Sequence, residues 1–71
     1  MVFNDFMPLI HRGVNCGFYL VNAIEGYCIE CKDRTELFKT LKQNGFLSDI
    51  RYQVTGVSVH ENKLIIEFLK R

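Results

Sequence analysis

The chain has 71 residues, fewer than the roughly 100–150 typical of a domain, so we expect a single domain over residues 1–71. Its formal net charge of +1 excludes the strong basic field by which many proteins attract nucleic acids or anionic membranes. Hydrophobic residues make up 48% of the chain and charged residues 24%, a composition typical of folded rather than disordered proteins.

The first thirteen residues are expected to form a short helix or a helical turn. Asn4 or Asp5 can cap its start, and Gly13 can end it. Pro8 would lie in the first turn, where its missing amide costs least. The apolar residues that share one side at helical spacing are expected to cover a core: Phe6, Leu9 and Ile10.

Two runs of β-forming residues follow, residues 18–21 and 27–29. Glu25-Gly26 lies between them and is typical of a tight turn, because glycine adopts the positive φ that hairpin turns need. The sequence therefore predicts a hairpin with a two-residue turn. In that register the facing pairs would be Ile24 with Tyr27, Asn22 with Ile29, and Leu20 with Cys31.

A helix over residues 34–44 is the clearest local signal. Asp33 can cap its start, and Glu36 at the third helical position approaches a capping box. Gly45 can end the helix, with Phe46 placed for the hydrophobic contact of a Schellman-type stop. The predicted buried stripe consists of Leu37, Phe38 and Leu41.

A second hairpin is predicted from residue 50 to residue 69. Apolar and polar residues alternate up to Gly56, where a β-bulge would absorb a change of phase. Glu61-Asn62 is the predicted turn, and it pairs Val59 with Leu64 and Val57 with Ile66. The apolar residues of the first strand are all expected to face the core: Ile50, Tyr52, Val54, Val57 and Val59.

The predicted order is α-β-β-α-β-β, an α+β fold with a four-stranded antiparallel or mixed sheet, a central helix and a short N-terminal helix. The strand order stays open, because the central helix permits several arrangements. In the last strand, Ile65 and Leu69 fall on the face opposite the apolar set Leu64, Ile66 and Phe68. The first helix covers this second face, or the face is open.

Cys28 and Cys31 form a C-x-x-C motif, a spacing found in zinc sites, and further ligands could come from His11, Cys16 and His60. A strand sends residues three apart to opposite faces, and neither glycine nor proline lies within the motif to form a tight turn. We therefore expect no metal and no cofactor, with a zinc site through Cys28 and Cys31 as the alternative.

The sequence also argues against catalysis. His60 and Glu61 fall at the predicted hairpin tip, where nothing excludes water, and the chain has no phosphate-binding glycine loop.

Three cysteines cannot close a disulfide framework, and the longest apolar stretch, Gly17 to Ile24, is too short to span a membrane. We expect a non-enzymatic protein in the cytoplasm, without a secretory signal or a membrane partner.

Nucleic-acid binding is the alternative function. Nine aromatic residues on a small sheet could stack unpaired bases, with phosphate contacts from Arg34, Lys39, Lys42 and Arg51. Most of the aromatic residues fall on predicted core positions, and acidic residues interrupt the basic surface. These two observations place nucleic acid behind protein as the expected partner.

Protein association follows from the small size. Surface scaling predicts about 4,600 Å² exposed and about 7,500 Å² hidden on folding. If ~60% of the hidden area is apolar, burial contributes about 110 kcal/mol against ~107 kcal/mol of ordering entropy. Because these two free-energy terms nearly cancel, burial of further surface against a partner would stabilise the chain. We therefore expect a homodimer, or a regulator, inhibitor or adaptor of a larger protein. Ile65 and Leu69 are the predicted contact.

Overall fold

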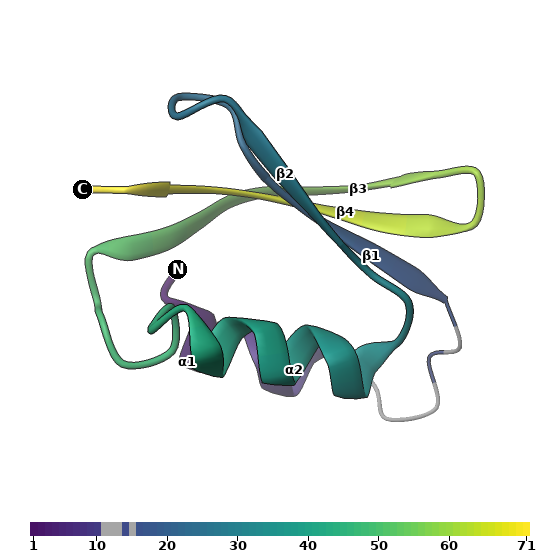
Figure 1. Cartoon of the computed structure of the whole chain (residues 1–71), viewed down its shortest axis with the longest axis horizontal. Helices are drawn as coiled ribbons and strands as arrows, with labels where there is room; N and C mark the ends of the chain where they lie inside the picture. Colours follow the sequence, from purple (N-terminus) through teal and green to yellow (C-terminus); the bar gives the residue numbers. More distant parts are fainter. Residues whose placement is uncertain (11–13, 15) are drawn as a thin grey trace.

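Four strands form one mixed sheet, and the helical segments lie on one side of it (Figure 1). The computed structural model describes residues 1–10, 14 and 16–71. The elements in chain order are α1 (Phe3–Phe6), the 3-10 helix η1 (Met7–Leu9), β1 (Gly17–Asn22), β2 (Tyr27–Cys31), α2 (Arg34–Gln43), β3 (Tyr52–His60) and β4 (Lys63–Lys70). The predicted α+β class and element order are confirmed. The accessible surface of 4708 Å² is close to the value expected from size.

The strand order is β2-β1-β4-β3, which the sequence left open. β1 and β4 are parallel neighbours at the centre of the sheet, and each hairpin supplies one outer strand. α2 connects the two hairpins along the chain and contacts β1 and β2, while α1 contacts β3. None of the helices in the described part of the chain is long and apolar enough to cross a membrane.

The first hairpin has a four-residue turn, so its predicted register is wrong by two residues. The facing pairs are Phe18 with Cys31, Leu20 with Ile29, and Asn22 with Tyr27. Asn22 explains the difference, because its Oδ1 accepts the Glu25 amide at 3.0 Å and its carbonyl accepts the Gly26 amide at 2.8 Å. A shift of two residues keeps every side chain on its predicted face.

The second hairpin has the predicted register. Val59 faces Leu64, and Val57 faces Ile66. The turn residues Glu61 and Asn62 have φ of 49° and 66°, the left-handed conformations that a two-residue turn requires.

The predicted bulge is also present, because the register shifts between Val54 and Gly56 and leaves Thr55 as the extra residue. Tyr52 and Val54 pack against the core as expected. The prediction for Ile50 is wrong, since this residue lies in the turn before β3 and is exposed. That turn forms because the carbonyl of Asp49 accepts the Tyr52 amide at 3.1 Å.

α2 starts as predicted at its Asp33 cap. The Glu36 amide donates to Asp33 Oδ1 at 2.8 Å. Leu37 and Leu41 are fully buried against the sheet. Phe38 is exposed, so its predicted burial is wrong, because the two leucines define a narrow stripe and Phe38 falls beside it.

α2 ends in a complete Schellman motif at Gly45 and Phe46, as predicted, although its last helical residue is Gln43 rather than Asn44. Gly45 has φ of 73°, and its amide donates to the carbonyl of Lys42 at 3.2 Å. The Phe46 amide donates to the carbonyl of Leu41 at 2.9 Å, and both side chains are buried.

The N-terminal helix starts earlier than predicted. Val2 is its N-cap residue and no side chain caps it, so the predicted capping by Asn4 or Asp5 is wrong. Asn4 instead donates its side-chain amide to the carbonyl of Leu47 at 2.7 Å. Pro8 lies in the first turn of η1, not of α1. The predicted end at Gly13 lies outside the described residues.

Phe6 and Ile10 are buried as predicted, but Leu9 is exposed. Leu9 belongs to η1, whose three residues per turn break the helical spacing assumed for the stripe.

The core centres on Phe68 of β4. Its ring centroid lies 5.4 Å from that of Phe3 and 5.0 Å from that of Phe46. Tyr27 and Tyr52 flank the same ring at 6.0 and 6.3 Å. These contacts join α1, the loop after α2 and both hairpins into one hydrophobic core.

Candidate protein-binding surface

The sheet face away from the helices is open in the part of the chain that the structure describes. α1 packs on the same side as α2, where Phe3 and Leu37 share one core (Figure 1). The alternative in which the first helix covers the second face is therefore wrong. Ile65 and Leu69 lie on this open face, as predicted, because they alternate along β4 with buried Ile66 and Phe68.

Ile65 and Leu69 are each half-buried rather than strongly exposed. Exposed Glu67 lies between them on the same face. Tyr19 lies beside Ile65, and Gln53 lies beside Leu69. The two predicted contact residues thus share a face, with exposed Glu67 between them along β4.

A polar cluster ties three strands together on the open face. Lys63 Nζ donates to Glu30 Oε2 at 2.7 Å and to the Tyr19 hydroxyl at 3.0 Å, and it lies 4.8 Å from the centre of the Tyr19 ring. The hydrogen bond from Lys63 lowers the pKa of the Glu30 carboxyl, and the bond to Glu30 raises the pKa of Lys63. The two hydrogen bonds from Lys63 join β1, β2 and β4 across the open face.

The outer strand β3 carries the most exposed aliphatic side chains of the sheet. Val57 is 49% exposed and Val59 is 71% exposed, although both lie on the side that faces the helices. The β3–β4 turn extends beyond the first turn of α2, which starts at the same side of the molecule (Figure 1). The predicted burial of these two valines is therefore wrong, because the described helices do not reach them.

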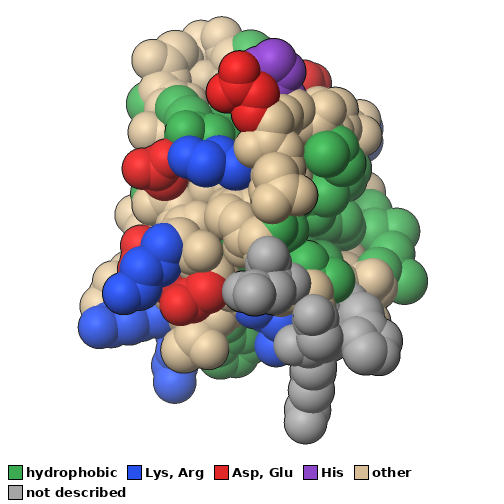
Figure 2. All heavy atoms as spheres, turned by 90° about the vertical axis from the view of Figure 1, so that its right-hand side faces the viewer, with side chains coloured by type: hydrophobic (Ala, Val, Ile, Leu, Met, Phe, Trp, Pro, Cys, Tyr) green, Lys and Arg blue, Asp and Glu red, His purple; other side chains and the backbone are tan. Residues whose placement is uncertain are grey.

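The space-filling view of this end of the molecule shows hydrophobic side chains below the histidine near the top, on the side away from the Lys and Arg side chains (Figure 2). The exposed aliphatic residues of the hairpin that ends there are Val57 and Val59. This surface, with the outer edge of β3 beside it, is called the β3 edge below.

The β3 edge is covered at one end only. Val2 forms an isolated bridge with Gln53, and the Val54 amide donates to the carbonyl of Met1 at 2.6 Å. Beyond Val54, no described segment other than β4 pairs with β3. Residues 52–60 contain neither a charged residue nor a proline, the residues that usually protect an edge strand from other chains.

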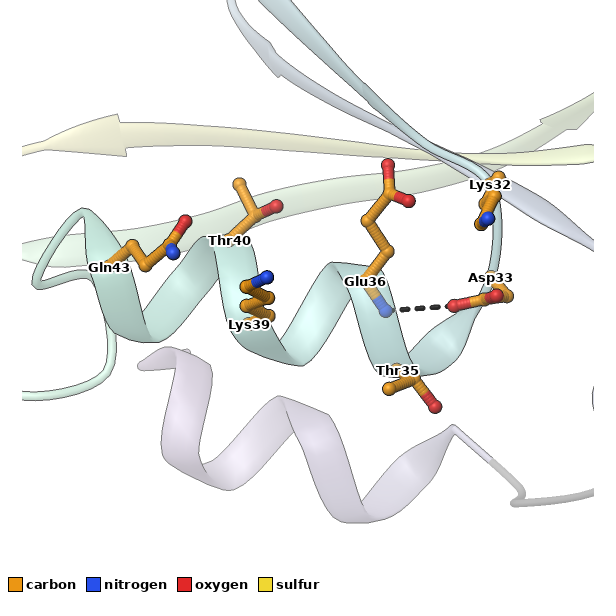
Figure 3. Close-up of a pocket in the computed structure, with 7 residues that line it drawn as sticks. All are labelled: Lys32, Asp33, Thr35, Glu36, Lys39, Thr40 and Gln43. Carbon is orange, nitrogen blue, oxygen red and sulfur yellow. Dashed lines mark hydrogen bonds between the residues drawn. The ribbon is translucent and has the colours of Figure 1, made fainter.

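A second surface feature is a shallow groove of about 380 Å³ along α2. Its lining residues are Lys32, Asp33, Thr35, Glu36, Lys39, Thr40 and Gln43 (Figure 3). The lining mixes two lysines with two acids, and the Asp33 carboxylate is already bonded to the helix amide of Glu36. The groove therefore offers no concentrated charge for a ligand.

The cysteines of the C-x-x-C motif do not converge. Cys28 is exposed on the open face, whereas Cys31 is buried under α2, where its Sγ donates to Thr40 Oγ1 at 3.6 Å. Among the described residues, no group of three His, Cys, Asp or Glu could hold a metal ion. The candidate ligand His11 lies outside the described residues, and His60 sits at the exposed turn, 3.8 Å from Glu61.

Most of the aromatic residues are not available for stacking bases; among the described residues, exposed Phe38 on α2 is the exception. Five phenylalanines are buried, and Tyr27 and Tyr52 pack against the same core. Of the aromatic residues on the sheet, Tyr19 alone faces the open side, and Lys63 lies over its ring. The basic residues Lys39 and Lys42 lie on α2, on the other side of the sheet.

The sequence missed the β3 edge because it placed Val57 and Val59 in the core. A signal was present in the uncharged, proline-free run of residues 52–60. That run indicates an unprotected edge only once the strand order is known. No protein-family model, curated protein or solved structure matches the chain.

Proposed function

We propose that this protein is a non-enzymatic binding module that associates with protein through the β3 edge. One observation carries the proposal: an uncharged outer strand displays two exposed valines beside backbone groups that no other described segment pairs. Such an edge can accept an added strand, because main-chain hydrogen bonds provide affinity and alternate side chains provide specificity.

The chemistry of the edge supports protein over nucleic acid as the partner. Valine side chains and strand amides match an extended polypeptide, whereas a nucleic acid would require cations and exposed rings at the same place. No described feature favours nucleic acid specifically, so oligonucleotide binding enters only as an outcome of the test. We also propose a cytoplasmic location, which is supported by three free thiols.

The test is selection of short peptides displayed on phage, followed by NMR mapping of the bound site. We expect the selected peptides to be extended and to shift the amide resonances of residues 55–60. Replacing Val57 and Val59 by lysine should abolish binding. The matched control replaces Ile24 and Ile50, which are 76% and 74% exposed, by lysine and adds the same charge elsewhere.

Peptides that bind equally well to both lysine variants would overturn the proposal, as would peptides whose shifts map to other residues. Saturable, salt-dependent binding of a single-stranded oligonucleotide would replace protein by nucleic acid as the partner. The prediction for Ile65 and Leu69 is tested in the same assay by replacing both with lysine. Loss of binding in that variant alone would move the site to the open face.

A further inference from the structure

We propose that the occupant of the β3 edge is a second copy of this chain. The two copies pair through antiparallel β3 strands around a two-fold axis at Ser58, which sets Val57 of each copy against Val59 of the other. This inference rests on the proposed function and names its partner. Four features of β3 support it: the length of the uncovered stretch, the backbone directions, the faces of the side chains and the charges.

The uncovered stretch has Ser58 at its centre. Met1 and Val2 occupy the edge as far as Val54, and the turn with left-handed backbone begins at Glu61. The bulge at Thr55 precedes regular pairing, so residues 56–60 remain as the straight part of the edge. A two-fold axis at Ser58 uses all five residues in both copies, with Gly56 opposite His60 of the other copy.

Neighbouring registers fit less well. An axis at Val57 would place His60 against Val54, whose amide already donates to the carbonyl of Met1. An axis at Val59 would place Gly56 against Asn62, which is a turn residue with φ of 66°. The axis at Ser58 avoids both conflicts.

The backbone directions agree with this axis. In an antiparallel ladder, every second residue directs its N–H and C=O groups toward the neighbouring strand, and the residues between direct theirs away. His60 and Lys63 flank the two-residue turn and face each other, so His60 directs its groups toward β4. By alternation, the groups of Val57 and Val59 point outward, where they can bond to the same residues of a second copy.

The side chains agree with the same register. Val57 and Val59 lie on one face of the sheet, so pairing each with its counterpart gathers four valines on the side of the helices. Val57 is 49% exposed and Val59 is 71% exposed, so both residues have surface that a second copy can cover. Cross-strand pairs of β-branched residues are among the stabilising contacts of antiparallel sheets.

The charges permit the pairing. Residues 55–60 carry no Asp, Glu, Lys or Arg, so no like charges oppose one another along the contact. Glu61 falls opposite Thr55 of the other copy rather than opposite another carboxylate. A stretch of five residues spans roughly 17 Å and places the contact among small, transient interfaces, so we expect dissociation in the micromolar range or weaker.

The test is analytical ultracentrifugation of the full chain from micromolar to millimolar concentration. We expect the mass to rise from one chain to two. Replacing Val57 and Val59 by lysine should keep the chain monomeric, and replacing Ile24 and Ile50 by lysine should leave the dimer intact. A wild-type mass that stays at one chain over the whole range, or that grows beyond two, overturns the inference.

Ser58 provides a test of the axis itself. It is exposed on the open face, so S58K and S58E should each fold, which circular dichroism checks. Each variant alone opposes two like charges at the axis and should associate at least tenfold more weakly than the wild type. An equimolar mixture of the two should recover the dimer, because lysine then faces glutamate.

Failure of the mixture to recover association would show that the axis does not pass through Ser58. A chain that remains monomeric but binds displayed peptides at residues 55–60 would refute the second copy and leave the proposed function intact. A chain that neither dimerises nor binds displayed peptides at residues 55–60 would refute the proposed function as well.

Discussion

Cys28 and Cys31 lie three residues apart on β2, yet their thiols point to opposite faces of the sheet, one exposed and the other buried under α2. This arrangement follows from the two-residue period of a strand, and it separates two side chains that would converge on a turn. The motif therefore consists of one accessible thiol and one core thiol.

The two thiols should differ strongly in reactivity. Burial raises the pKa of the Cys31 thiol, and the hydrogen bond with Thr40 opposes that rise only in part. In a chain with Cys16 replaced by serine, we expect one thiol to react with a disulfide reagent at the rate of an exposed cysteine. The other should react only as the protein opens. If replacing Cys28 by serine leaves the fast phase in place, the assignment is wrong.

Removal of the cap at Asp33 should destabilise the protein through α2. Asp33→Ala leaves the Glu36 amide without its acceptor, which costs about 1 kcal/mol in comparable helices. Urea unfolding measures the change in the free energy of unfolding. Asp33→Asn should retain most of the stability because its side-chain oxygen can accept the same bond. Equal losses in both variants would show that charge, not capping, is responsible.

Truncation of Phe68 should be the most damaging single change in the core. Its ring contacts aromatic residues from α1, both hairpins and the loop after α2. Phe68→Ala should cost roughly 3–5 kcal/mol, which is a large part of the stability of so small a domain. Ile50→Ala, at a position that is 74% exposed, serves as the control and should change the midpoint of urea unfolding little.

The end of α2 depends on the left-handed backbone of Gly45. A Cβ at this position would meet no closer atom than Ser48 Oγ at 3.9 Å, so space is not limiting. Gly45→Ala should nevertheless cost about 1 kcal/mol, because an L side chain disfavours φ of 73°. Gly45→Asn should cost less. An alanine variant as stable as the wild type would show that the helix end can rearrange without a penalty.

The Asp49–Arg51 ion pair should make stability depend on pH in acid. Hydrogen bonds from Arg51, from side chain and backbone, lower the pKa of the Asp49 carboxyl from 3.8 to about 2. Because the pKa of Asp49 is lower in the folded than in the unfolded state, the contribution of the ion pair to the free energy of unfolding is fully present above the unfolded-state pKa near 4. It is lost as the pH falls through about 2.

The Asp49 titration is measurable by NMR of the side-chain carboxyl carbon. Arg51→Gln should return the midpoint toward its ordinary value, while Lys42→Gln, on α2, should leave it unchanged. A wild-type midpoint near 4 would contradict the ion pair.

Features whose causes lie within a few residues could be predicted from the sequence. The Asp33 cap, the Gly45 stop, the bulge before Gly56 and the Glu61-Asn62 turn were all predicted correctly. Each depends on a local hydrogen bond or a backbone preference, which the chain carries wherever the segment is placed. The first hairpin was wrong in register because the bond from Glu25 to Asn22 lengthens the turn, while its faces were right.

The neighbours of each strand and the burial of each residue depend on contacts between segments that are distant in the sequence. β1 and β4 are far apart in the sequence, and their parallel pairing makes β2 and β3 the outer strands. Val57 and Val59 have the pattern of core residues, yet they are exposed because the β3–β4 hairpin extends past the start of α2, which does not cover them. A residue is buried only if an element distant in the sequence extends over it, and the local pattern of apolar residues does not show how far that element extends.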